Sequence, residues 1–165
     1  MYCPKCGSEL STKNIDGHVR QYCPNCGFIF YENPLPVVAA LCYRKKGELL
    51  LIKRGIPPHK GVWALPTGFL ELNESVEEGL QRELREETAV SRKDILKMKL
   101  LDVIYQPSEM YKGVIVIGFS VRLRKNTKII AGDDAADAAF YNLSEMPDNP
   151  FFSQQQLIAK FKGIR

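Results

Sequence analysis

Short runs of apolar residues, separated by turn residues, make up most of the chain and predict β-strands. Two such runs lie at 37–44 and 48–54. Gly47 lies between them and can take the positive φ of a hairpin turn, so we expect these two strands to pair. Three further runs of the same kind lie at 98–106, 113–124 and 138–143.

Two segments are expected to form helices. One begins at Ser75, where Glu78 stands three positions later and completes the S-x-x-E pattern of a capping box. The other spans 153–162, and Ser153 is the expected N-cap. Strands interspersed with helices predict an α/β (α+β) fold.

The first thirty residues differ from the rest in composition. They contain CPKCG and CPNCG, so four cysteines stand as two pairs with sixteen residues between them; these are Cys3, Cys6, Cys23 and Cys26. This is the spacing of a zinc ribbon, in which the metal replaces a hydrophobic core. The sequence therefore predicts a ribbon at 1–30, a proline-rich linker at 31–36 and a second domain at 37–165.

Alternatives to a zinc site are two disulfides or four unrelated thiols, and the doubled motif favours zinc. Four thiolates close the coordination sphere, which indicates a structural ion and leaves no position for substrate. His18 lies on a polar loop and is expected to be exposed. Cys42 lies within an apolar run and is expected to be buried.

Composition and charge exclude several classes of protein. The chain has 165 residues, 45% of them hydrophobic, and a net charge of +4 without a long run of Lys or Arg. Charge alone therefore gives no case for binding nucleic acid or membranes. The longest apolar stretch, 35–43, is far shorter than the ~20 residues that span a bilayer. Because the N-terminus lacks the apolar core of a signal peptide, we expect a reducing cytoplasm.

Glutamates crowd the helix that begins at Ser75. At ~100° per residue, Glu83 and Glu87 lie beside the apolar stripe of the helix, whereas Glu78 lies opposite it. A solvated charged face would place every acid away from the stripe. Carboxylates turned inward repel each other, and a divalent cation such as Mg²⁺ or Mn²⁺ would offset that repulsion.

The same segment resembles the Nudix box, G-x5-E-x7-R-E-U-x-E-E-x-G-U, at every fixed position but one. Gly68, Glu74, the run Arg82-Glu83-Leu84 and the pair Glu86-Glu87 occupy the expected positions, and Ala89 replaces the final glycine. The resemblance extends over 37–165.

This resemblance implies a mixed sheet sandwiched between helices and hydrolysis of a nucleoside diphosphate linked to another moiety. Glu83 and Glu87 would be the main Mg²⁺ ligands, the Gly68 carbonyl a backbone ligand, and Glu86 a further ligand or a group that orients water. Glu74 and Arg82 would organise the loop and helix. The general base is expected among the box glutamates, with Asp133 and Asp134 as rivals; a polar turn explains those two equally well.

A zinc ribbon before a Nudix domain resembles the NADH pyrophosphatase group. That group carries S-Q-P-W-P-F-P-x-S after the box, whereas this chain has YQPSEMYKG at 105–113 and lacks the Trp-Pro-Phe core. ADP-ribose, NADH, FAD and oxidised nucleoside triphosphates all remain open as substrates. Among the aromatic residues that can stack on a base, Trp63 and Phe69 are the expected contacts.

The rival hypothesis is a binding protein in which the ribbon contacts nucleic acid and the Nudix fold senses a nucleotide without cleaving it. Lys5, Lys13 and Arg20 lie on the ribbon, but three cations are a small footprint. A ribbon-mediated homodimer is compatible with either hypothesis.

Overall fold

The computed structural model describes residues 1–163, which form two compact units, Met1–Asn33 and a larger one that begins at Pro34. The first strand of the larger unit, β4 (Leu35–Tyr43), begins inside the predicted linker, so Leu35 and Pro36 are strand residues. No helix among residues 1–163 has the length and apolar character needed to span a membrane.

The smaller unit is a three-stranded antiparallel sheet with two cysteine turns. Its strands are β1 (Ser11–Ile15), β2 (His18–Tyr22) and β3 (Ile29–Phe30), in the order β1-β2-β3. In each cysteine turn the amide of the closing glycine donates to the carbonyl of the first cysteine, at 2.9 Å. Gly7 and Gly27 have φ of 75° and 73°, the left-handed conformation expected from the two CPxCG motifs.

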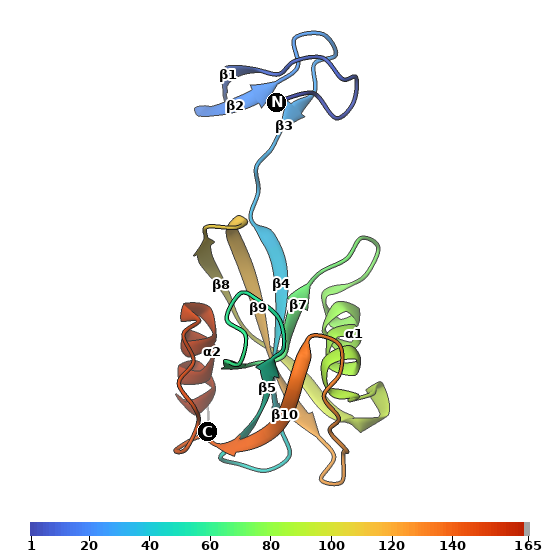
Figure 1. Ribbon diagram of the computed structural model, residues 1–165, viewed down its shortest axis with the longest axis vertical. Helices are drawn as coiled ribbons and strands as arrows, with labels where there is room; N and C mark the ends of the chain where they lie inside the picture. The colour runs from blue at the N-terminus through green and yellow to red at the C-terminus, as the bar shows by residue number, and fades with distance from the viewer. Residues whose placement is uncertain (164–165) are drawn as a thin grey trace. The chain divides into compact units, whose positions relative to one another are not determined.

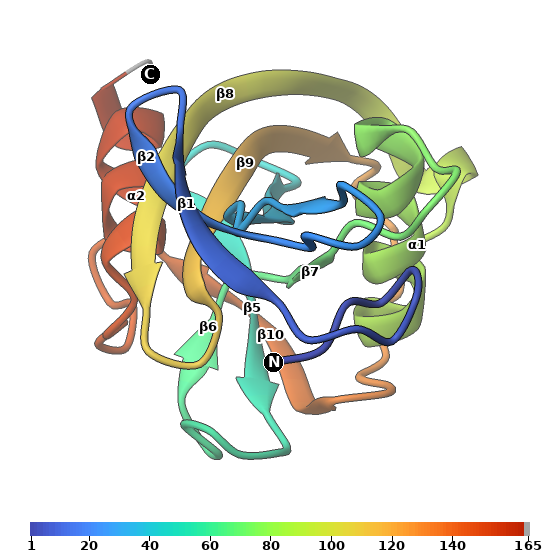
Figure 2. The same ribbon diagram turned by 90° about the horizontal axis from the view of Figure 1, so that it is seen from above.

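The larger unit has two sheets between two helices, α1 (Val76–Thr88) and α2 (Phe152–Gly163), which flank the strands on opposite sides (Figures 1 and 2). A four-stranded sheet has the order β7-β4-β9-β8, and a three-stranded sheet has the order β10-β5-β6. The remaining strands are β5 (Glu48–Arg54), β6 (Trp63–Ala64), β7 (Thr67–Phe69), β8 (Ile95–Ser108), β9 (Lys112–Leu123) and β10 (Ala135–Asn142). Because β4 runs parallel to β9 and the other pairs are antiparallel, the sheet is mixed. The predicted fold class is confirmed.

Strand β4 explains why the apolar runs are continuous. Its residues alternate between two cores, with Val38 and Ala40 on the side of α1 and Ala39 and Leu41 on the side of α2. All four are fully buried. A strand covered on both faces needs apolar residues at successive positions, which accounts for the continuous apolar run.

The predicted hairpin between 37–44 and 48–54 is wrong. The turn exists, and Gly47 has φ of 84°, but β4 and β5 belong to different sheets. Both edges of β4 are occupied by β7 and β9, and β5 pairs instead with β10 and β6. The chain therefore crosses from one sheet to the other at this turn.

The predicted N-cap of the C-terminal helix is also wrong. Because α2 begins at Phe152, Ser153 lies inside its first turn and is buried. The amide of Ser153 donates to the side chain of Gln106 at 3.0 Å, which ties α2 to β8. This long-range partner replaces the local cap that the sequence pattern suggested.

Helix α1 has the predicted capping box. The Ser75 hydroxyl accepts from the Glu78 amide, and the Glu78 carboxylate accepts from the Ser75 amide at 2.8 Å. At the other end, Ala89 takes the left-handed conformation with φ of 56°, and its amide donates to the Arg85 carbonyl at 3.0 Å. The helix thus ends as it would with glycine, at a conformational cost of about 1 kcal/mol.

The segment before β10 lies against the C-terminus of α1. The amides of Ile130 and Gly132 donate to the carbonyls of Thr88 and Glu87, each at 3.1 Å. These bonds satisfy carbonyls that the last turn of a helix leaves unpaired. A Cβ added at Gly132 would lie 2.7 Å from the Glu86 carbonyl oxygen, so only glycine fits this approach.

We predict that Gly132→Ala destabilises the larger unit by about 1–3 kcal/mol, because the new methyl group would overlap a helix carbonyl that cannot move freely. Urea unfolding followed by the fluorescence of Trp63, the one tryptophan, measures this change. Gly163→Ala is the matched control, since a Cβ there meets nothing within 4 Å. Equal stability of the two variants would contradict the close approach.

Candidate active site

Two carboxylates of α1, Glu87 buried and Glu83 partly buried, lie where the helix packs on β7. Glu87 is 5% exposed, and the side chain of Glu83 is 13% exposed. The amide of Thr67 in β7 donates to Glu87 Oε2 at 3.1 Å. A Cβ at Gly68 would overlap the carboxylate of Glu83, so the glycine leaves the space that this carboxylate fills. The inward direction predicted for both glutamates is confirmed by their burial.

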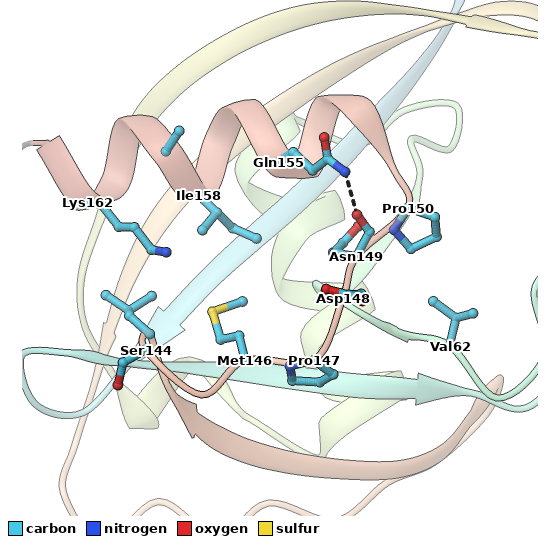
Figure 3. A pocket seen from close by; sticks show the side chains of 12 residues that line it. Val62, Ser144, Met146, Pro147, Asp148, Asn149, Pro150, Gln155, Ile158 and Lys162 are labelled. Carbon is cyan, nitrogen blue, oxygen red and sulfur yellow. Dashed lines mark hydrogen bonds between the residues drawn. The ribbon is translucent and has the colours of Figure 1, made fainter.

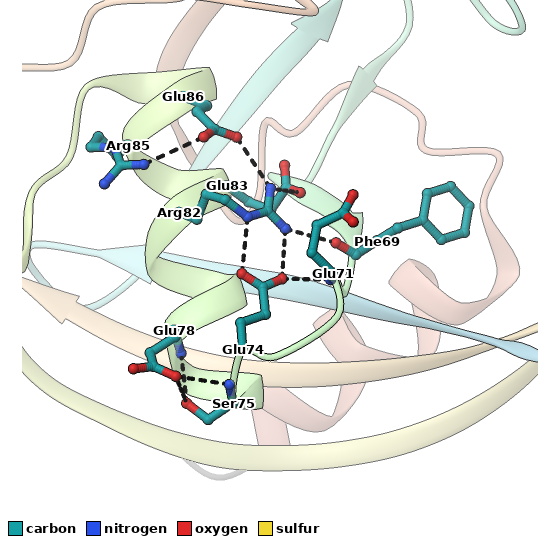
Figure 4. A network of polar contacts seen from close by, with 9 residues as sticks. All are labelled: Phe69, Glu71, Glu74, Ser75, Glu78, Arg82, Glu83, Arg85 and Glu86. Carbon is teal, nitrogen blue, oxygen red and sulfur yellow. Dashed lines mark hydrogen bonds and ion pairs between the residues drawn. The ribbon is translucent and has the colours of Figure 1, made fainter.

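Arg82, on α1, contacts three carboxylates: Glu74 in the loop before the helix, and Glu83 and Glu86 on the helix itself (Figure 4). Its Nε and Nη2 bind both oxygens of Glu74, at 3.0 and 2.8 Å, and its Nη1 lies 2.6 Å from Glu83 and 3.2 Å from Glu86. Nη2 also donates to the Phe69 carbonyl at 2.8 Å. One guanidinium therefore holds the loop, the helix and the carboxylates in register, as expected of a planar fork of donors.

The surroundings of Glu74 lower its pKa, whereas those of Glu83 and Glu87 raise theirs. Hydrogen bonds from Arg82 lower the pKa of Glu74 to about 2. Burial, with the nearby charge of Glu83, raises the pKa of Glu87 to about 9, and burial also raises the pKa of Glu83. Two carboxylates placed together in a partly dry site are unstable as a charged pair unless a cation joins them.

The donor set fits a hard divalent cation. Glu83, Glu87 and the backbone at Gly68 offer oxygen atoms only, which are the ligands that Mg²⁺ and Mn²⁺ prefer. Glu86 is more open, with 36% of its side chain exposed, and Arg82 and Arg85 contact its two oxygens. The residues at this site are therefore compatible with a metal that keeps water ligands.

The two aspartates proposed as rival bases lie at the start of β10, in an exposed turn. Asp133 has a left-handed φ of 49°, and the Asp134 carbonyl accepts from the Gly55 amide at 2.7 Å. The charge of Asp134 contributes to the raised pKa of Glu87, so the structure brings Asp134, by its charge, into the neighbourhood of the carboxylates.

Arg54 was missed by the sequence analysis. It ends β5, and its Nε donates to the Pro58 carbonyl at 3.0 Å. Its positive charge partly offsets the rise in the pKa of Glu87 that burial causes. The sequence did carry a signal for Arg54, namely a basic residue at the end of a run of apolar residues. Its relation to Glu87 depends on the pairing of β5 with β10, which the pattern did not show.

The two aromatic residues expected at the substrate site lie in different surroundings. Phe69 ends β7 next to Gly68, is 36% exposed and packs edge-on against Tyr111, with ring centroids 4.9 Å apart. Trp63 packs edge-on against Tyr141 at 5.0 Å and joins the core on the side of α2. The structure thus brings Phe69, and not Trp63, to the carboxylate site.

The four N-terminal cysteines form a separate site in the smaller unit. Their sulfur atoms lie within 4.8 Å of one another, and Cys3–Cys26 and Cys6–Cys23 are 3.6 and 3.5 Å apart. Zinc–sulfur bonds of about 2.3 Å in a tetrahedron require sulfur atoms about 3.8 Å apart. The cluster therefore fits a zinc ion, and the fifth cysteine, Cys42, is buried elsewhere as expected.

Two family models, one for each unit, identify the family of the chain. The NUDIX domain family model matches residues 33–161, and the zinc-ribbon model described as Nudix N-terminal matches residues 1–32. The chain belongs to the Nudix hydrolase family. Its Nudix domain is the larger unit, and its ribbon is the smaller one.

Known relatives show what the chain is similar to. The ADP-ribose pyrophosphatase of Methanocaldococcus jannaschii is 39% identical over 122 residues, which cover 73% of this chain and 69% of that protein. The NAD-capped RNA hydrolase NudC of Pseudomonas aeruginosa is 28% identical over 149 residues, 90% of this chain and 50% of NudC. This chain therefore spans half the length of NudC.

A solved structure confirms the fold over both units. The crystal structure of a NUDIX hydrolase from Nitrosomonas europaea aligns with a TM-score of 0.74 and 24% identity, and the alignment covers 99% of this chain and 91% of that one. At this identity the likeness concerns the fold alone.

A groove of the Nudix domain is separate from the carboxylates. It has a volume of about 760 Å³ and lies between α2 and the segment 143–150, with Ile158 and Lys162 on the helix side (Figure 3). None of its lining residues belongs to the carboxylate site. Asn149 in its wall donates to the Gln154 side chain at 2.7 Å, and that oxygen also accepts from the Leu65 amide at 2.8 Å.

We predict that Glu74→Gln destabilises the Nudix domain at neutral pH and that the difference from wild type disappears in acid. Because the folded pKa of Glu74 is about 2, below the ordinary value near 4.3, its charge stabilises the fold above that ordinary value. This stabilisation is lost as the pH falls toward 2. Urea unfolding between pH 7 and pH 3, followed by Trp63 fluorescence, measures the difference.

Glu77→Gln is the control for this titration, since Glu77 lies three residues after Glu74, in the first turn of α1, and is exposed. A Glu74→Gln variant with wild-type stability at pH 7 would show that the Arg82 network does not support the fold.

Proposed function

We propose that the Nudix domain is an Mg²⁺- or Mn²⁺-dependent pyrophosphohydrolase that cleaves a nucleoside diphosphate linked to another moiety. The observation that carries this proposal is the placement of Glu83 and Glu87 together beside Gly68 with little exposure to solvent, because a divalent cation would let both carboxylates stay charged there. Glu83, Glu87 and the Gly68 carbonyl would hold it, with Glu86 as a further ligand or as the group that orients water.

A bound divalent ion would neutralise charge on the phosphate oxygens and lower the pKa of water. The chain's own residues position the reaction. Arg82 fixes the carboxylates of Glu83 and Glu86 relative to the loop, and Glu74 anchors Arg82. A water oxygen would attack one phosphorus while the bridging P–O bond breaks, which yields two monophosphate products.

The proton of the attacking water must pass to a base. We propose a box glutamate for this role, and Glu86 has the most exposed carboxylate of the three. Asp134 is the rival, since its charge acts on Glu87. Asp133, its neighbour in the same exposed turn, is the other rival.

ADP-ribose is the first substrate that we propose, because the relative with 39% identity is named an ADP-ribose pyrophosphatase. An NAD-linked substrate is the second, supported by the likeness to NudC over both units. The segment 105–113 lacks the Trp-Pro-Phe core of the NADH pyrophosphatases and favours the first. Phe69, exposed beside Gly68, is the proposed contact for a base or nicotinamide ring; the packing of Trp63 in the core argues against a similar role.

A nucleotide sensor without hydrolysis is the alternative function. The complete set of Glu83, Glu86 and Glu87, together with the network around Arg82, favours catalysis, since a sensor has no need of every acid.

We predict that Glu83→Gln and Glu87→Gln each lower kcat by two or more orders of magnitude, because each removes a negative oxygen ligand from the metal site. Phosphate release, coupled to a phosphatase that acts on the monophosphate products, measures turnover of ADP-ribose, NADH and FAD with Mg²⁺ or Mn²⁺. Glu77→Gln, on the exposed face of the same helix, is the matched control and should retain wild-type turnover.

Wild-type turnover by Glu83→Gln and Glu87→Gln would show that the buried carboxylates do not hold the catalytic metal. The absence of turnover with every substrate in wild type would favour the sensor.

We further propose that the cysteine cluster binds one structural zinc and that the ribbon folds separately from the Nudix domain. The double variant Cys3→Ser/Cys6→Ser should lose the zinc, while Cys42→Ala should keep it, because Cys42 lies outside the cluster. Zinc per chain is measured by metal analysis after dialysis. The unfolding midpoint reported by Trp63 should be unchanged in the double variant; a large fall would contradict separate folding.

A further inference from the structure

The zinc ribbon has no part in the proposed hydrolysis, and its strand register assigns its side chains to two faces. Lys13 lies opposite Arg20 in the β1–β2 pair, and Tyr22 lies opposite Ile29 in the β2–β3 pair. Because successive residues of a strand point to opposite faces, one face carries every second residue. This face comprises Ser11, Lys13, Ile15, His18, Arg20, Tyr22 and Ile29. We call it the basic face.

Cations and aromatic rings pair on the basic face. The Lys13 ammonium lies 5.8 Å from the centroid of the Tyr22 ring, and the Arg20 guanidinium lies 4.6 Å from that of Tyr31, which follows β3. Both distances are in the range of cation–π contacts. Tyr31 is half exposed. The sheet therefore presents two cations, each backed by an aromatic ring.

Within the part of the chain that the structure describes, no acid forms an ion pair with these cations, although Glu32 lines the same pocket as Arg20. The basic face itself carries no Asp or Glu. Neither Lys13 nor Arg20 forms an ion pair with a described residue, and the Arg20 Nε is buried without a hydrogen-bond partner. An anionic ligand would pair with the Lys13 ammonium and with the outer nitrogens of the Arg20 guanidinium, since the buried Nε lies out of reach of solvent.

We propose that the basic face of the zinc ribbon binds single-stranded nucleic acid. Phosphates would pair with Lys13 and Arg20, and unstacked bases would lie on the guanidinium and on the tyrosine rings, which is how sheets with exposed aromatic and basic residues hold single strands. Three cations on the ribbon, taken by their number alone, are few for a surface that binds nucleic acid. Their placement on one face with two aromatic rings makes the surface suitable for a strand of alternating charge and planar base.

The binding test uses the full chain loaded with zinc. Fluorescence anisotropy follows a labelled single-stranded RNA of mixed sequence, without Mg²⁺, so that no hydrolysis enters the measurement. The wild type should bind with a dissociation constant of about 10⁻⁶–10⁻⁴ M, the range of non-specific binding. Lys13→Ala/Arg20→Ala should weaken binding by tenfold or more, and the slope of log K against log salt should fall by about 1.4, since two phosphate contacts are lost.

Lys125→Ala/Lys128→Ala is the matched control, because it removes the same charge from exposed positions of the Nudix domain. Its affinity should stay within about twofold of wild type. Tyr31→Leu keeps both cations and should weaken binding five- to tenfold through lost stacking. Zinc content shows that each variant retains the ribbon, and Lys13→Ala alone, at an exposed position, should still weaken binding about threefold.

Single-stranded DNA should bind like the RNA, and a duplex of the same length at least tenfold more weakly, because its bases are not free to stack. The proposal is overturned if the wild type does not bind at low salt, if the control variant weakens binding as much as the basic-face variant, or if the duplex binds as tightly as the single strand. None of these results depends on hydrolysis.

Discussion

The guanidinium of Arg82 is the contact on which the arrangement of the carboxylate site depends. It binds both oxygens of Glu74 in the loop, contacts Glu83 and Glu86 on the helix, and donates to the Phe69 carbonyl at the end of β7. Few side chains other than arginine can make all these contacts, since a lysine lacks the planar set of donors. The loop and the helix are therefore held together by one side chain at the place where a metal would bind.

The fold supports this site from both ends of α1. The capping box of Ser75 and Glu78 starts the helix beside the loop, and the segment at Ile130–Gly132 pairs with its last carbonyls. These contacts hold the helix in place against β7. In this position Glu83 fills the space left by Gly68, and Glu87 accepts a hydrogen bond from the Thr67 amide. Burial then raises the pKa of Glu87, which makes the pair dependent on a cation for its charged form.

Features governed by local pattern could be predicted from the sequence. The capping box, the inward direction of Glu83 and Glu87, and the cysteine turns all follow from residue types at fixed spacings, and the structure contains each of them. Features governed by long-range pairing could not. The separation of β4 and β5 into two sheets depends on β9 and β10, far along the chain, and the partner of the Ser153 amide is Gln106.

Two residues near the site illustrate the same limit. Arg54 lies near Glu87 in space because β5 pairs with β10, and the need for glycine at position 132 comes from a helix carbonyl more than forty residues earlier. Neither relation can be predicted from the residues that lie next to Arg54 or Gly132 in the sequence. The cations and tyrosines of the ribbon likewise share a face only because of the register of β1, β2 and β3.

The most direct test of the account is the binding of Mn²⁺ to the zinc-loaded protein, measured by loss of the electron paramagnetic resonance signal of free Mn²⁺. The account predicts binding by the wild type, loss of affinity by tenfold or more in Glu87→Gln, and wild-type affinity in Glu77→Gln. Equal affinity in all three proteins would show that the buried carboxylates of α1 do not form the metal site.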